Sequence, residues 1–146
     1  MGDISKDIQS TFKNHKVKAF LNIKYTANWL SSNENTFFKP FGISPQQYNI
    51  LRILRGAGER MKAQTVKERM VERAPNATRL MDKLCEKSLT IRERCEHDKR
   101  VVYVTITDKG LSLLSEIDKV SSELNILKNL TEKEAKQLSD LLDKIR

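Results

Sequence analysis

The fold of this chain is decided by two adjoining segments, PNATRLMDKLCEK at residues 75–87 and SLTIRERCEHDKRVVYVTITDKG at residues 88–110. In the first segment the apolar residues fall on one arc of a helix when about 100° is allowed per residue. These residues are Ala77, Leu80, Met81 and Leu84. The opposite arc is polar and carries Asn76, Thr78, Arg79, Asp82 and Lys83. The pattern predicts a helix that buries one face and presents a polar one.

The polar arc suits nucleic acid. Its amide, hydroxyl and cationic groups can reach base edges and phosphates, and a helix about 12 Å across fits the major groove of DNA. An ordinary solvated helix face would have a similar composition. The segments on either side therefore have to decide between the two interpretations.

The segment that follows has the period of strands. Leu89 and Ile91 alternate with Thr90 and Arg92, and Val102, Val104 and Ile106 alternate with Val101, Tyr103 and Thr105. We expect a β-hairpin with Leu89 and Ile91 on its buried face. The loop over residues 94–100 is polar and contains Arg94, Lys99 and Arg100. A basic hairpin tip directly after such a helix is typical of a wing, whose cations can enter the minor groove of DNA.

A helix start precedes this region. Ser44 is a predicted N-cap, Pro45 occupies the first helical position, and Gln47 completes a capping box. Gly56 and Gly58 are expected to end the helix.

A short helix is predicted next, over residues 63–71, because Val66 and Met70 are four residues apart. Residues 72–74 (Glu72, Arg73 and Ala74) connect it to Pro75, which suits the first turn of the following helix. The order is therefore helix, short turn, helix.

Long apolar helices flank this part of the chain. The first is predicted over 4–35, with Phe37, Phe38 and Phe41 in a connection. A second begins at the N-cap Thr107 and runs to a stop at Asn129, with an apolar stripe of Leu111, Leu114, Ile117, Val120, Leu124 and Leu127. A capping box at Thr131 opens the last, with Leu138, Leu141, Leu142 and Ile145 on one face. We expect these helices to pack against a second subunit, with an intramolecular three-helix cluster as the alternative.

Composition limits the possible functions. The 146 residues are the length of one domain, and the formal charge of +8 favours an anionic partner or simple solubility. Residues 1–58 carry 8 basic and 3 acidic side chains, residues 59–109 carry 13 and 9, and residues 110–146 carry 6 and 7. The C-terminal third is therefore not the anion-binding part. The sequence has neither a membrane span nor a signal peptide, which predicts a cytoplasmic protein.

Chemistry-bearing residues are sparse. Cys85 and Cys95 are too few for a disulfide framework, and Cys95-Glu96-His97 lacks the spacing of a metal site, so neither metal nor cofactor is expected. A redox role for the cysteines would need exposure and a lowered thiol pKa. The sequence contains no phosphate-binding glycine loop and no nucleophile motif, so we expect no catalytic residues and no enzyme activity.

The arrangement resembles the MarR family of bacterial regulators over nearly the whole chain. The most specific match is Thr78-Arg79-Leu80-Met81-Asp82-Lys83-Leu84, similar to the family's recognition helix. It continues through Lys87, Leu89, Arg92 and Asp98-Lys99-Arg100 to Thr107-Asp108-Lys109-Gly110. The resemblance implies a mainly α fold with a small β-hairpin wing, a winged helix-turn-helix (43–106) flanked by N- and C-terminal dimerisation helices (1–42 and 107–146) in one domain, 1–146.

The resemblance also implies roles for individual residues. DNA would be contacted by Asn76, Thr78, Arg79, Lys83, Arg92, Arg94, Asp98, Lys99 and Arg100, with Arg100 in the minor groove and Asp98 orienting it. Two departures stand out. Ser88 replaces the family's usual glycine, at a cost of roughly 1 kcal/mol if its backbone is left-handed. Arg94, Cys95 and Glu96 replace an Asp-Pro-type turn.

Members of the family often bind small aromatic effectors near the junction of the first helix with the DNA-binding part. Tyr25, Trp29, Phe41 and Tyr48 are the candidate lining here, although core or interface packing would also explain these aromatics. We expect a homodimeric regulator, a repressor released by an effector, that binds an inverted repeat in double-stranded DNA. A winged-helix module for protein or RNA contacts is the alternative.

Overall fold

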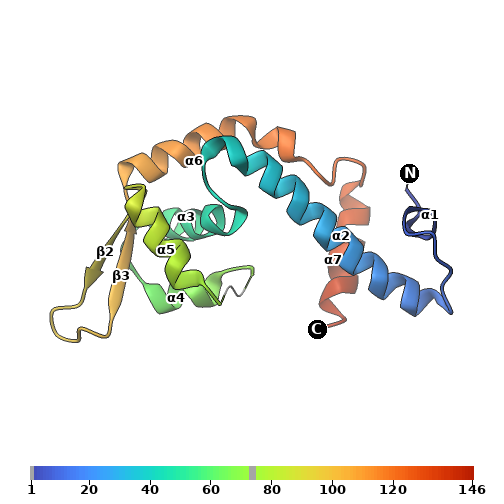
Figure 1. Cartoon of the computed structure of the whole chain (residues 1–146), viewed down its shortest axis with the longest axis horizontal. Helices are drawn as coiled ribbons and strands as arrows, with labels where there is room; N and C mark the ends of the chain where they lie inside the picture. Colours follow the sequence, from blue (N-terminus) through green and yellow to red (C-terminus); the bar gives the residue numbers. More distant parts are fainter. Residues whose placement is uncertain (1, 73–74) are drawn as a thin grey trace.

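A computed structural model describes residues 2–72 and 75–146 (Figure 1). The helices are α1 (Ile4–Asp7), α2 (His15–Phe38), α3 (Pro45–Ala57), α4 (Ala63–Arg69), α5 (Ala77–Glu86), α6 (Asp108–Val120) and α7 (Glu132–Asp143), with 3₁₀ turns η1 (Lys39–Phe41) and η2 (Ser121–Leu124). The strands are β1 (Met61–Lys62), β2 (Thr90–Arg94) and β3 (Val102–Ile106). The predicted mainly helical fold with a β-hairpin is confirmed. The expected connector residues Arg73 and Ala74 lie outside the described residues.

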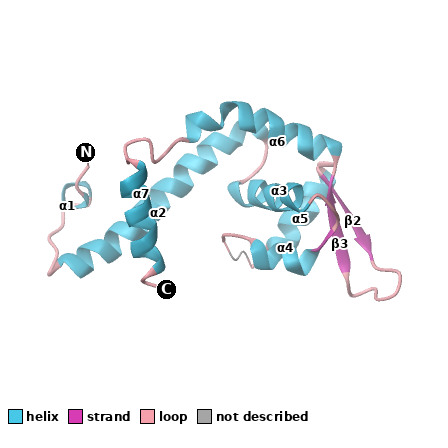
Figure 2. Cartoon of the chain, turned by 180° about the vertical axis from the view of Figure 1, so that it is seen from behind, coloured by secondary structure: helices cyan, strands magenta, loops and turns pink. Residues whose placement is uncertain are grey.

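The elements fall into two groups along the molecule. In Figures 1 and 2, α3, α4, α5 and the β2–β3 hairpin gather at one end, and α2 leads away from them toward α1 at the other end. Helix α6 starts at the base of the hairpin and contacts α3. The hairpin tip therefore lies far from both chain termini.

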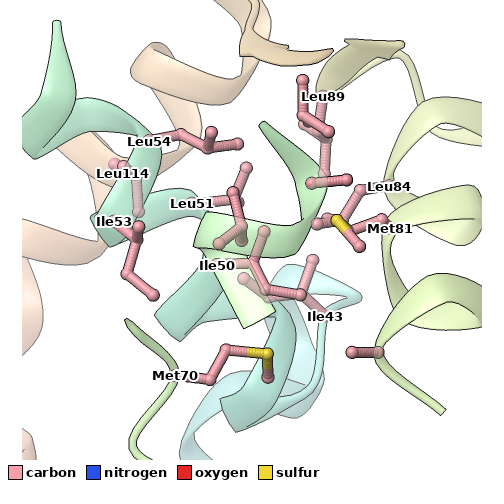
Figure 3. Packing of buried hydrophobic residues seen from close by; sticks show 14 of the residues in the cluster. Ile43, Ile50, Leu51, Ile53, Leu54, Met70, Met81, Leu84, Leu89 and Leu114 are labelled. Atoms are coloured by element: carbon pink, nitrogen blue, oxygen red, sulfur yellow. The ribbon is translucent and has the colours of Figure 1, made fainter. Parts of the chain in front are cut away.

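The core surrounds α3, whose Ile50, Leu51 and Leu54 are fully buried (Figure 3). Residues from every neighbouring element complete it: Phe38, Ile43, Ile53, Ala63, Val66, Met70, Ala77, Met81, Leu84, Leu89, Val104, Leu114 and Ile117. Burying one large aliphatic side chain contributes about 1.5–3 kcal/mol. This one cluster therefore fixes α3, α4, α5, α6 and the sheet relative to each other.

Helix α3 begins where the sequence predicts. The Gln47 N–H donates to Ser44 Oγ (3.1 Å), and the Ser44 N–H donates to Gln47 Oε1 (3.0 Å), which completes the capping box. Gly58 ends the helix with a left-handed backbone (φ 68°), whereas Gly56 lies inside the helix instead of stopping it.

The sheet differs from the prediction in two ways. Its order is β1-β3-β2, all antiparallel, and the two-residue strand β1 was not predicted. In β2 the buried residue is Thr90, which pairs with Ile106, whereas Ile91 is 53% exposed. Leu89 is buried as predicted, but the predicted burial of Ile91 was wrong. The reason is that Leu89 still belongs to the turn that ends α5, since its N–H donates to the Leu84 carbonyl (2.9 Å).

The N-terminal helix is interrupted, contrary to the prediction for 4–35. Helix α1 ends at Asp7, Gln9 has a left-handed backbone (φ 49°), and α2 starts again where Asn14 Oδ1 accepts the Val17 N–H (3.0 Å). Phe37 and Phe38 lie in the last turn of α2 and not in the connection.

Two other predicted boundaries were wrong. Helix α5 begins at Ala77 with Asn76 as its N-cap, so Pro75 precedes the first turn. Helix α6 ends at Val120, nine residues before the predicted stop at Asn129, and continues only as the 3₁₀ turn η2.

Candidate nucleic-acid interface

Helix α5 separates its two faces as the sequence predicts. Ala77, Met81 and Leu84 are at most 2% exposed, whereas the side chains of the polar arc lie at the surface. The exposed polar residues are Asn76, Thr78, Arg79 and Lys83. The exposed face of α5 therefore presents amide, hydroxyl and cationic groups that take no part in the hydrophobic core.

Arg92 of β2 is held against α5. Its Nη1 donates to Asp82 Oδ1, and the Arg92 side chain is only 25% exposed. The ion pair joins the hairpin to the helix, so Arg92 has a positioning role whatever else it contacts. The sequence placed Asp82 on the polar arc but did not indicate this pairing.

The hairpin tip is organised by Asp98. Its carboxylate accepts the Arg100 N–H (3.0 Å) and the Arg100 Nε–H (3.3 Å), and its carbonyl accepts the Val101 N–H (2.9 Å). The Arg100 side chain is 93% exposed, and Arg94 and Lys99 are also exposed. The Arg100 guanidinium therefore points into solvent while the Asp98 carboxylate accepts hydrogen bonds from both the Arg100 backbone and its side chain.

The turn between α5 and the hairpin is a Schellman motif. The Leu89 N–H donates to the Leu84 carbonyl (2.9 Å) and the Ser88 N–H to the Cys85 carbonyl (2.8 Å). Ser88 is the residue that adopts the left-handed conformation (φ 59°). The strain predicted for a serine at this position is therefore present.

Helix α6 is packed directly on this turn. The Thr107 Oγ1–H donates to the Ser88 carbonyl (2.8 Å), and the Thr107 N–H donates to the Leu89 carbonyl (3.1 Å). A Cβ on Gly110 would lie 2.4 Å from the Leu89 oxygen and 2.7 Å from Ile106 Cγ1. The Thr-x-x-Gly motif is thus explained, since threonine caps α6 and glycine lets it approach the turn.

Within the described residues of the single chain, the candidate effector residues have different surroundings. Trp29 lines a cavity of about 540 Å³ between α2 and residues 124–129, whereas Phe41 lines a different one of about 430 Å³ with Lys87 and Lys109. Tyr48 packs on Phe38 with ring centroids 4.5 Å apart, and Tyr25 is 42% exposed. Tyr25 and Trp29 lie on α2, Phe41 lies in η1 and Tyr48 lies on α3.

Both cysteines are free thiols, and Cys85 Sγ lies 3.2 Å from Thr90 Oγ1. Within residues 2–72 and 75–146, no cluster of three histidine, cysteine or acidic residues is suited to hold a metal ion. In the same residues, no helix is both long enough and apolar enough to cross a membrane.

Comparison with known proteins agrees with this geometry. The profile of the family "Transcriptional regulator SarA/Rot" matches residues 35–117, which include α3, α4, α5 and the hairpin. The chain belongs to the SarA/Rot family of transcriptional regulators. The MhqR regulator of Bacillus subtilis (strain 168), described as HTH-type, is 24% identical over 131 residues, which cover 88% of this chain and 90% of that protein.

Solved structures show the same architecture. A MarR transcription factor from Planctomyces limnophilus is 32% identical, with a TM-score of 0.71 over 91% of this chain and 98% of that one. A mutant of MarR from E. coli, solved with operator DNA, is 25% identical, with a TM-score of 0.78 over 93% and 99% of the two chains. The resemblance to MarR proteins is confirmed, and this SarA/Rot family member is a DNA-binding transcription regulator with a winged helix-turn-helix.

Proposed function

We propose that the protein binds an inverted repeat in duplex DNA as a homodimer, with α5 in the major groove and the hairpin tip in the adjacent minor groove. The observation that carries the proposal is the groove lined jointly by Thr78 of α5 and by Arg92 and Arg100 of the hairpin. One duplex lying across this groove meets the polar arc of α5 and the wing together. The wing and the polar arc also favour DNA over the alternative of a module for protein or RNA contacts.

In this proposal Asn76, Arg79 and Lys83 read or flank base edges, while Arg94, Lys99 and Arg100 bind from the wing. Asp98 orients Arg100, and Arg92 fixes the hairpin against α5. The test is selection of a preferred duplex from a random pool, followed by fluorescence anisotropy with the parent and Arg79→Ala. If Arg79 reads a base, the variant loses about 1–3 kcal/mol of discrimination between operator and random duplex. Unchanged discrimination would remove Arg79 from the reading surface.

The dimer is supported by apolar surface that the single chain leaves uncovered. Helix α2 has 24 residues, yet Phe38 is the only buried one in its described length. Phe20 is 59% exposed, and on α7 and just after it Leu141 and Ile145 are 61% and 68% exposed. Residues 1–42 and 107–146 then form the dimerisation part and residues 43–106 the DNA-binding part of a single domain.

Light scattering tests the dimer. We expect a mass at micromolar concentration of about twice the 16.9 kDa of one chain. A mass of one chain at every concentration would contradict the proposal. With two recognition helices on one duplex face, the half-sites should lie about 10–10.5 bp apart, or at a multiple of that spacing.

Repression and release by a small aromatic effector complete the proposed function. The cavity beside Phe41 is lined by apolar side chains (Phe41, Leu89 and Leu113) and by charged ones (Lys87, Lys109 and Glu116). The Lys87 and Lys109 ammonium groups donate to the Gly42 and Lys87 carbonyls. It lies where α6 packs on the end of α5, so a ligand there would act on the recognition helix. Titration with benzoate and with phenol, followed by operator binding, tests this site. A Phe41→Ala variant that responds to both ligands like the parent would exclude the cavity.

A further inference from the structure

A small groove runs between the first helix of the helix-turn-helix, the recognition helix and the wing. Its volume is about 230 Å³. The lining comes from three segments: Lys62, Ala63, Gln64 and Lys67; Thr78 and Met81; and Arg92, Arg100, Val101 and Val102. A group bound here would touch all three DNA-facing elements at once.

The groove has an uncompensated positive charge. Four of its lining residues are cationic, and the lining contains no carboxylate. Arg92 and Arg100 are neutralised by Asp82 and Asp98, which lie outside the lining.

Lys62 and Lys67 differ from these arginines. Among the residues that the structure describes, neither lysine has a carboxylate oxygen within 4.0 Å, the distance that defines an ion pair. Lys67 is also half-buried. Two lysines that line one groove without an ion pair repel each other, and a bound anion would replace that repulsion by attraction.

The chemistry of the lining favours a phosphate. Lysines bind phosphate as point charges, and the Thr78 hydroxyl and the Gln64 amide can donate further hydrogen bonds. In helix-turn-helix complexes the first helix crosses the DNA backbone while the second lies in the major groove. A phosphate of that backbone would therefore pass this position.

We propose that this groove holds one backbone phosphate of the bound duplex in each subunit, and that the phosphate ties the wing to the helix-turn-helix. The inference rests on the proposed DNA-binding mode and extends it. It adds Lys62 and Lys67 to the interface, which the sequence analysis did not single out, and it assigns Thr78 to the backbone and not to a base.

The test is Lys67→Gln, with Lys133→Gln on α7 as a control that makes the same charge change at an exposed site. We expect Lys67→Gln to weaken binding to every duplex alike by about tenfold, the lower end for a hydrogen bond to a charged group. Its log affinity should also depend less on log salt, by about one unit of slope. Lys133→Gln should bind like the parent.

A scan with neutral methylphosphonates locates the contact. At one position in each half-site, removing the charge should weaken the parent but leave Lys67→Gln unchanged, because that variant has already lost the contact. If the loss of affinity from the methylphosphonate and the loss from Lys67→Gln are additive at every position, the proposal is overturned. Thermal unfolding tests whether Lys67→Gln folds. If that variant does not fold, Lys62→Gln provides an independent second variant.

The failures of the two proposals are distinguishable. A parent protein that binds no duplex refutes the proposed function. A parent that binds, with Arg79→Ala relaxing specificity and Lys67→Gln behaving like the parent, refutes only the phosphate site. An NMR titration with inorganic phosphate provides a final control. If phosphate shifts the Lys67 and Thr78 amide signals while the methylphosphonate scan finds no coupled position, the groove binds a free ion and the assignment to the DNA backbone is wrong.

Discussion

Ser88→Gly should stabilise the protein, because Ser88 closes the Schellman turn with a left-handed backbone (φ 59°). For a residue with a Cβ this conformation costs about 1–2 kcal/mol. Glycine avoids that cost but loses more backbone entropy on folding, by roughly 0.5–1 kcal/mol. We therefore expect a net gain of about 0.5–1 kcal/mol in the free energy of unfolding.

Urea denaturation at neutral pH measures this gain. A rise in the midpoint with an unchanged slope would show that stability changed and that the denatured state did not become more compact. Ser88→Ala is the matched control. It retains the Cβ and the strain, and the Ser88 hydroxyl makes no hydrogen bond within the described residues, so it should unfold like the parent.

An unchanged midpoint in Ser88→Gly, or a gain in Ser88→Ala as large as that of the glycine variant, would contradict the prediction. In the first case the turn relaxes in a way that removes the strain. In the second case the gain comes from losing the hydroxyl. DNA binding provides a further check, since the turn joins α5 to the wing and a more flexible turn should not improve affinity.

The remaining predictions concern the same junction, the wing and α2. Gly110→Ala should destabilise the protein, because the new Cβ would clash with the Leu89 carbonyl oxygen. The overpacking costs about 1–3 kcal/mol, and the better helix propensity of alanine offsets up to about 1 kcal/mol of it. A Tm equal to the parent's would contradict this prediction. Arg100→Ala should weaken DNA binding and lower its salt slope by about one unit, with thermal stability changed by less than about 0.5 kcal/mol. Asp98→Ala should also weaken binding in fluorescence anisotropy, although it removes a negative charge, and tighter binding would exclude its orienting role. Burial raises the pKa of Glu34, so its ionised form costs stability above that pKa; Glu34→Gln should raise the urea midpoint at pH 7 and lose this advantage at about pH 3, below the ordinary pKa.

Local signals predicted much of the fold. The capping boxes at Ser44 and Thr131 and the cap at Thr107 use side chains within three residues of the N–H groups they satisfy, so the sequence alone defines them. The buried arc of α5 was predictable for the same reason, because apolar residues at helical spacing meet one core.

Other features depend on distant partners. Strand β1 has only two residues, and its existence depends on pairing Met61 with Val104 on β3. The burial of Thr90 in place of Ile91 follows from where the α5 turn ends. The break before α2 depends on Asn14, a residue that suits a helix cap but also occurs in helices, so apolar spacing alone predicted one continuous helix.

The interface shows the same division between local and distant information. The wing motif contains both Asp98 and Arg100, two residues apart, so their pairing could be expected from a resemblance. The pairing of Arg92 with Asp82 joins residues ten positions apart in different elements and follows only from the fold.

In both the Arg92–Asp82 and the Arg100–Asp98 pair, a carboxylate holds an arginine near the proposed DNA-binding surface. That surface is therefore not uniformly basic. Each pair gives up net attraction for DNA, since a neutralised arginine adds less to long-range association than a free one. In return the guanidinium groups are fixed before binding, which lowers the entropy that is lost when binding orders them. The lysines of the groove have no such partners in the described residues, so in the proposed interface they would supply attraction while the arginines would supply geometry. If the proposed interface is right, the basic side chains of this +8 chain contribute to DNA binding in two distinct ways, and the positions of the carboxylates distinguish them.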